Sequence, residues 1–178
     1  MVKYVGVLIV LMAFAAPAFA QDDYAQMEIS LGYGNINLKN SGVDGRHSGF
    51  ASHQAFNITS KFAIENYVGY YGLGTTTIPN FGTTKVQLLT NTFGGKLNYR
   101  TAGPVLYVSG GLGAGWLRLP DVGTGSDNAF AVRIGGGVDI PINDYFSAKV
   151  DVSRHSYHFG DWKSGVNIST GLVIKITQ

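Results

Sequence analysis

A two-residue alternation of apolar and polar side chains recurs through most of this chain. In residues 128–140, one parity is wholly apolar or glycine and includes Phe130 and Ile134. The other parity holds small residues and opposite charges, such as Arg133 and Asp139. Successive side chains of a strand point to opposite faces, so a period of two indicates a β-strand with one apolar face. The alternation therefore predicts an all-β protein.

Eight segments show this alternation, and 47–58 shows it most weakly because it holds few large apolar residues. The eight segments are 27–34, 47–58, 62–71, 85–100, 105–119, 128–140, 146–156 and 164–177. An even number of strands allows an antiparallel sheet to close on itself with both ends of the chain on the same side.

The connections between these segments alternate in length. The short ones are 59–61, 101–104 and 141–145. The longer ones are 39–46, 72–84, 119–127 and 157–163. This alternation is typical of an up-and-down meander that crosses a membrane, where a sheet must close because lipid offers no partner for backbone groups. We therefore expect an eight-stranded antiparallel up-and-down transmembrane β-barrel with short periplasmic turns and longer extracellular loops.

The polar parity is expected to line the lumen, which in an eight-stranded barrel is only wide enough for side chains. Four acids and five bases lie on this parity: Glu28, Glu65, Asp139, Asp151, Lys96, Arg100, Arg133, Lys149 and Lys175. Unpaired charges in a narrow interior are costly. We therefore expect an ion-pair network that plugs the barrel, which argues against a small porin.

A soluble periplasmic β-barrel would instead turn the apolar parity inward. Its solvent face would then be almost half Gly, Ala and Ser, with few Lys or Glu to keep it soluble. Charged residues make up 13% of the chain, against about 25% in ordinary soluble domains. Aromatic residues such as Tyr33, Tyr99 and Trp116 lie toward strand ends on the apolar parity, as in interfacial girdles. These features favour the membrane barrel.

The first twenty residues are expected to form a separate, cleaved segment. Lys3 precedes an apolar run over 4–15, and Ala-Phe-Ala at 18–20 matches an A-x-A cleavage site. The apolar run is shorter than the roughly 18–20 residues of a spanning helix. We predict a signal peptide for Sec export at 1–20 and one barrel domain at 21–178.

A lipid hydrolase using His155 and Ser156 is the enzymatic alternative, since a histidine beside a serine can act as base and nucleophile. Ser153 and Asp151 share the parity of His155, but residues two apart on a strand are separated by roughly 7 Å. We expect a polar extracellular rim here and no enzyme.

Other chemistries find little support. The chain has four His and no Cys, and the His spacing does not match a metal site. Its net charge of +2 comes from scattered bases, which argues against a nucleic-acid partner. We expect no metal, no cofactor and no nucleic acid.

Exposed aromatic and histidine side chains in the long connections are candidates for recognition of a surface ligand, because loops on rigid scaffolds carry binding. They are Phe81, His158, Phe159 and Trp162. For Trp162 we favour a different interpretation, in which the side chain lies at the level of the lipid headgroups as an anchor.

Several short motifs resemble a known family. Residues 127–131 (Asp-Asn-Ala-Phe-Ala), 135–139 (Gly-Gly-Gly-Val-Asp) and 169–173 (Ser-Thr-Gly-Leu-Val) are similar to the bacterial outer membrane protein β-barrel domain family, small barrels like the transmembrane domain of outer membrane protein A. The resemblance implies a monomer in the outer membrane with a structural or surface-recognition role. It also implies outer membrane lipid and the barrel assembly machinery as partners. Such barrels usually end in an aromatic residue, whereas this chain ends Lys-Ile-Thr-Gln.

Overall fold

The computed structural model describes residues 24–39, 44–73, 75–78, 82–120 and 127–176. The strands are β1 (Met27–Lys39), β2 (Gly45–Asn57), β3 (Phe62–Leu73), β4 (Thr75–Ile78), β5 (Gly82–Lys85), β6 (Gln87–Arg100), β7 (Val105–Arg118), β8 (Asp127–Pro141), β9 (Phe146–His158) and β10 (Trp162–Ile176). No helix among these residues is long and apolar enough to cross a membrane. The predicted signal peptide at 1–20 lies outside the described residues.

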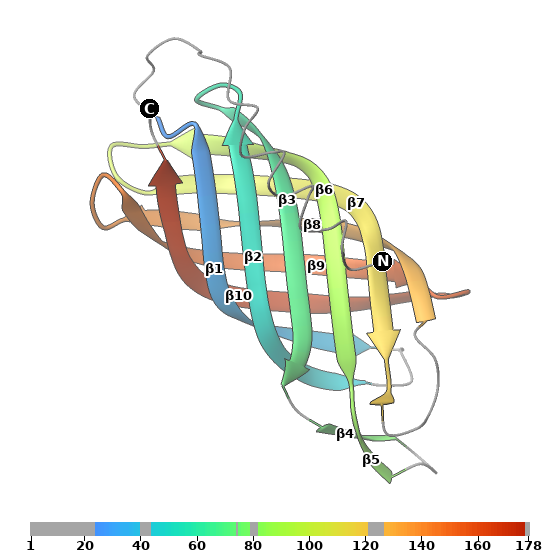
Figure 1. The fold of residues 1–178 in the computed structure, drawn as a ribbon. Coiled ribbons are helices and arrows are strands. Elements are labelled where there is room, and N and C mark those ends of the chain that lie inside the picture. Colours follow the sequence, from blue (N-terminus) through green and yellow to red (C-terminus); the bar gives the residue numbers. More distant parts are fainter. Residues whose placement is uncertain (1–23, 40–43, 74, 79–81, 121–126, 177–178) are drawn as a thin grey trace.

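Eight of the described strands form one closed barrel in the order β1-β10-β9-β8-β7-β6-β3-β2 (Figure 1). Each neighbouring pair is antiparallel, and consecutive barrel strands lie side by side. The ring closes where β1 pairs with β10, from Met27 opposite Ile176 to Lys39 opposite Ser164. The predicted eight-stranded antiparallel up-and-down barrel is therefore confirmed.

Two of the predicted long connections differ in detail. Within 72–84, β4 and β5 pair as a hairpin that extends beyond the barrel at the end opposite the start of β1 (Figure 1). At 157–163 the expected long loop is wrong, because β9 runs to His158 and β10 starts at Trp162. Gly160 adopts a φ of 92°, a left-handed conformation that glycine reaches without strain and that allows this tight turn.

The apolar parity of the strands faces outward. Leu31 is 64% exposed and Ile134 is 66% exposed, whereas Arg133 on the opposite parity is 2% exposed. An outward apolar surface around a closed sheet suits lipid and not water. The arrangement is the reverse of a soluble β-barrel, so that alternative is wrong.

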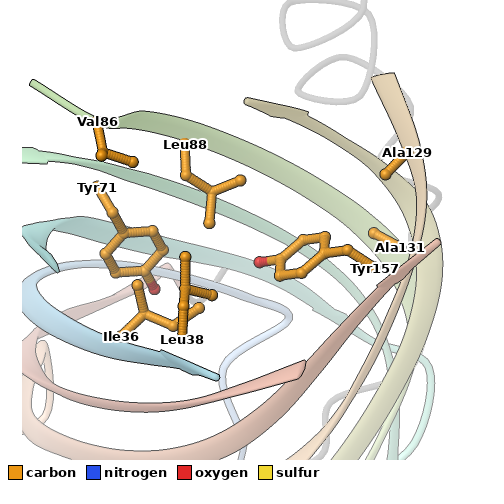
Figure 2. Close-up of a cluster of buried hydrophobic side chains, with 8 residues drawn as sticks. All are labelled: Ile36, Leu38, Tyr71, Val86, Leu88, Ala129, Ala131 and Tyr157. Atoms are coloured by element: carbon orange, nitrogen blue, oxygen red, sulfur yellow. The ribbon is translucent and has the colours of Figure 1, made fainter. Parts of the chain in front are cut away.

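The lumen also contains an apolar cluster that was not predicted. We call it the apolar outer layer, and its buried members are Ile36, Leu38, Tyr71, Val86, Leu88, Ala129, Ala131 and Tyr157. Figure 2 shows these side chains around one interior space. This space lies at the end of the barrel that bears the β4–β5 hairpin, because Leu38 is near the end of β1 and Leu88 near the start of β6. Leu117, Leu119 and Phe159 pack against them. The inward parity is thus polar along most of the lumen and apolar at its outer end.

Candidate functional site

Arg133 of β8 lies at the centre of the lumen and joins two acids from distant strands. Its Nη1 donates to Glu65 Oε1 at 2.9 Å, and its Nη2 donates to Asp151 Oδ2 at 2.9 Å. Nη1 also donates to Ser109 Oγ at 2.8 Å, and the guanidinium lies 4.4 Å from the centre of the Tyr67 ring. Four strands, β3, β7, β8 and β9, are therefore linked across the interior by one side chain.

A second group of ion pairs lies beside the first, toward the periplasmic end. Lys96 Nζ is 2.9 Å from Glu28 Oε2 and 3.1 Å from Asp139 Oδ2. Lys149 Nζ is 2.7 Å from the other oxygen of Asp139. The ring of Tyr107 lies under both ammonium groups, at 4.5 Å and 4.0 Å from its centre.

Tyr107 also connects the two groups of ion pairs, because its hydroxyl donates to Asp151 Oδ2 at 2.9 Å. The gap bordered by Glu28, His53, Glu65 and Lys149 has no room for a water molecule. Packing and ion pairing together fill this part of the lumen.

Seven of the nine predicted lumen residues lie in these two groups, and Arg100 lies at their edge. The Arg100 side chain is 25% exposed, with Nη2 at 3.5 Å from Glu28 Oε1. Its Nε donates to the carbonyl of Ser60 in the turn between β2 and β3. Arg100 therefore caps the periplasmic end of the ion pairs.

The prediction for Lys175 is wrong: it forms no ion pair with a described acid. It stands opposite Glu28 in the register of β1 and β10, but its Nζ donates to the carbonyl of Asn143 at 2.8 Å. The oxygens of Glu28 are already bound by Lys96, Arg100 and the amide of Asn57. The turn between β8 and β9 offers Lys175 a partner instead.

Histidine and tyrosine side chains fill the lumen between the ion pairs and the apolar outer layer. His53 Nδ1 is 3.4 Å from Glu65 Oε2, and the hydroxyls of Tyr67 and Tyr71 are hydrogen-bonded to each other. Alternation places Tyr67 and Tyr71 on the inward parity of β3, where they are buried, but the sequence predicts no role for these side chains or for His53.

The proposed pair of His155 and Ser156 does not exist as a catalytic dyad. His155 is completely buried in the lumen, where its Nε2 lies 3.2 Å from Ser153 Oγ. Ser156 is on the opposite parity of β9 and faces outward. Because successive residues of a strand point to opposite faces, the hydrolase based on these two residues has no geometric support.

The predicted recognition residues do not lie together in the fold. Phe81 lies outside the described residues. Phe159 packs against the apolar outer layer inside the mouth. Trp162 is 57% exposed on the outer wall, with its ring 5.2 Å from that of His158 and 6.5 Å from that of Phe130. This small aromatic group on the wall has the position of an interfacial anchor.

Among the described residues, no group of three or more His, Cys, Asp or Glu side chains is arranged to hold a metal ion.

Comparison with known proteins agrees with this geometry. A sequence model described as the outer membrane protein beta-barrel domain matches residues 6–174. The chain belongs to this family. No curated protein matches it in sequence.

Solved structures of small barrels resemble this member of the outer membrane protein β-barrel family. Neisserial surface protein A has a TM-score of 0.65 at 11% identity, covering 85% of this chain and 98% of that one. OprG from Pseudomonas aeruginosa has a TM-score of 0.60 at 12% identity, covering 87% and 98%. Ail from Yersinia pestis, in complex with the heparin analogue sucrose octasulfate, has a TM-score of 0.59 at 16% identity, covering 85% and 99%. At these identities the likeness concerns the fold.

Membership of the outer membrane protein β-barrel family gives the protein its location. It is an outer membrane barrel, and its outward apolar band is in contact with lipid.

Proposed function

We propose that this protein is a closed, non-conducting outer membrane barrel that acts through its outer surface, in surface recognition or in a structural role. The observation that supports the proposal is that two different sets of buried side chains fill the lumen at two levels. We also propose that residues 1–20 direct its export and are then removed.

The inner blockage is the set of ion pairs around Arg133 and Lys96. Opening it would leave buried carboxylates without partners, which typically costs about 3–5 kcal/mol for each broken pair. Residues from five of the eight barrel strands take part in these ion pairs, so no single strand movement relieves the blockage.

The outer blockage is the apolar outer layer. An ion entering from outside would have to pass Leu38, Leu88 and Tyr157 before it reached the buried ion pairs. A narrow apolar constriction excludes water and ions by dewetting. The two blockages work by different physics, so salt or pH that weakens one leaves the other in place.

Conductance in planar lipid bilayers tests the closed lumen. We expect the purified barrel to add no stepwise current, and we expect the same of the double variant Leu38→Ser/Tyr157→Ser because the ion pairs remain. Insertion is verified for each protein by the shift of its unboiled band in SDS gels. Discrete current steps from the inserted wild-type protein would overturn the closed lumen and favour the small porin.

Surface recognition is proposed for polyanions at the mouth of the barrel. Lys85 on the hairpin and Lys163 beside the mouth pocket bring positive charge to this end. The structure of Ail with a heparin analogue suggests heparin as the probe.

Retention on immobilised heparin tests this part of the proposal. We expect wild-type barrel in detergent to bind at low salt and the variant Lys85→Gln/Lys163→Gln to elute at lower salt, since screening weakens such contacts. Lys61→Gln, in the periplasmic turn, is the matched control and is expected to elute with wild type. Failure of the wild-type protein to bind would reject polyanion recognition without affecting the closed lumen.

A further inference from the structure

Charge is distributed unevenly on the outward face of the barrel. Four cations of the described barrel strands face outward, and all lie at the outer ends of their strands: Lys39, Arg46, Arg118 and Arg154. The acids within these strands are all on the inward parity: Glu28, Glu65, Asp127, Asp139 and Asp151. Closing the barrel does not require this arrangement, so it calls for a separate explanation.

Three of these cations gather around the closing strands β1 and β10. Four residues lie side by side across four neighbouring strands. Arg154 of β9 is paired with Val166 of β10. Val166 is paired with Asn37 of β1, which is in turn paired with Arg46 of β2. Three strand spacings separate the two arginine backbones, or about 14 Å. Arg154 also reaches toward β10, where its Nη2 is 3.4 Å from Ser164 Oγ.

A groove of about 440 Å³ lies on the outer wall at this place. One side comes from β1 and β2 and is polar apart from one aromatic ring: Tyr33, Asn35, Asn37 and Arg46. The other side comes from β10 and is mostly apolar: Val166, Ile168 and Thr170. A ligand that fits both sides must carry a polar, anionic part and a hydrocarbon part.

The polar side of the groove has free bonding capacity. Within the described part of the chain, neither the Arg46 guanidinium nor the Asn37 amide has a hydrogen-bond or ion-pair partner, whereas Asn35 accepts a bond from Ser48 Oγ at 2.8 Å. The acids nearest in sequence, Asp44 and Asp161, lie in the connections and not on the wall.

The groove also lies at the depth of the lipid headgroups. Roughly 9–11 residues of a tilted strand cross the hydrocarbon, and β1 has 13. Asn37 is the eleventh residue of β1, so the polar side of the groove reaches the interface of the outer leaflet.

We propose that this groove binds the phosphate-bearing headgroup of an outer-leaflet lipid, with Arg46 as the main contact and Arg154 beside it. Arginine presents a planar fork of donors that matches phosphate oxygens, and Asn37 adds an amide donor. The acyl chain lies along Val166 and Ile168. The proposal does not depend on whether the lumen conducts or the mouth binds polyanions.

Native mass spectrometry of the intact barrel tests the proposal, with phosphatidic acid as the probe. A basic side chain near anionic lipid typically contributes enough to change binding about fivefold. We therefore expect Arg46→Gln to bind about fivefold less phosphatidic acid than wild type, and Arg46→Gln/Arg154→Gln to bind less still. Arg118→Gln is the matched control, since Arg118 faces outward at the same end but lies away from the groove, and it is expected to bind like wild type.

Two competitors identify the part of the lipid that is bound. Diacylglycerol, which lacks the phosphate, is expected to bind weakly to every variant, and inorganic phosphate is expected not to displace the lipid. Equal binding of phosphatidic acid by wild type and the double variant would overturn the proposal. Displacement by inorganic phosphate would overturn it in favour of a simple anion site, and equal binding of diacylglycerol would leave only an apolar groove. The gel shift of each unboiled variant establishes that it is folded.

Discussion

At the scale of single residues, Arg133 is the side chain on which the interior depends most. It is bonded to both Glu65 and Asp151, and it is almost fully buried. A buried pair is not in itself strong support for stability, because both charges had to leave water. Removing one partner of the pair is strongly destabilising, because the charge that remains is buried and uncompensated.

Replacing Arg133 is therefore expected to destabilise the barrel. Arg133→Met should lower the free energy of unfolding by about 3–5 kcal/mol, measured by urea unfolding in phosphatidylcholine vesicles with the fluorescence of the two tryptophans. Arg154→Met, an outward arginine on the next strand, should change it by less than about 0.5 kcal/mol.

The triple variant Arg133→Met/Glu65→Leu/Asp151→Leu provides the stricter test. Replacing a whole buried ion-pair group by apolar residues is often neutral, so most of the lost stability should return. Equal unfolding midpoints for Arg133→Met and Arg154→Met would show that the pairs around Arg133 contribute nothing.

The sequence predicted which residues enter the lumen but not which of them pair. Parity alone placed Glu65 and Arg133 inside, because a period of two separates the faces of a strand. Their pairing joins positions 68 residues apart, which depends on strand tilt and on the side of the lumen each strand occupies. Lys175 shows the limit, since it stands opposite Glu28 and still bonds elsewhere.

At the scale of elements, β6 and β7 approach each other closely at a pair of glycines on opposite faces. A Cβ added to Gly94 would lie 1.9 Å from the carbonyl oxygen of Gly110, far inside van der Waals contact. A Cβ added to Gly110 would have its nearest neighbour at 3.6 Å, an ordinary contact. Gly94 therefore cannot carry a side chain unless the backbone of β7 moves, whereas Gly110 can.

The two alanine variants are expected to behave differently. Gly94→Ala must push β7 backbone aside, so its free energy of unfolding should fall by about 1–3 kcal/mol, as for other overpacked sites. Gly110→Ala should stay within about 0.5 kcal/mol of wild type. Urea unfolding in vesicles measures both, and a loss of the same size in both variants would mean that the close approach is not what limits this strand pair.

The sequence predicted the barrel strands well and their connections less well. Alternation is a strong signal over ten or more residues, but β4 and β5 are four residues each and too short to show it. The turn at Gly160 looked like a loop because aromatic and glycine residues cluster there. The apolar outer layer was missed because Ile36 and Leu38 lie on a parity that is small or polar in the rest of β1.

At the scale of the whole molecule, the barrel has two different ends. The periplasmic end holds the short turns, the start of β1 and the end of β10, and its lumen contains the buried ion pairs. The outer end carries the β4–β5 hairpin and the outward cations, and its lumen contains the apolar outer layer. Proposed lipid binding, polyanion binding and closure thus use different surfaces of one rigid sheet and can be varied separately.

The pairing of β1 with β10 has a consequence for how the molecule is made. One edge of the first strand must wait for the last strand, since Met27 can pair early with Phe56 of β2 but meets Ile176 of β10 only at the end. Until then, β1 presents a row of unpaired N–H and C=O groups to its surroundings, and such an edge is a template for pairing with other chains. The unfinished protein is therefore an aggregation hazard for nearly the whole time of its delivery, and something must shelter that edge until the ring is complete.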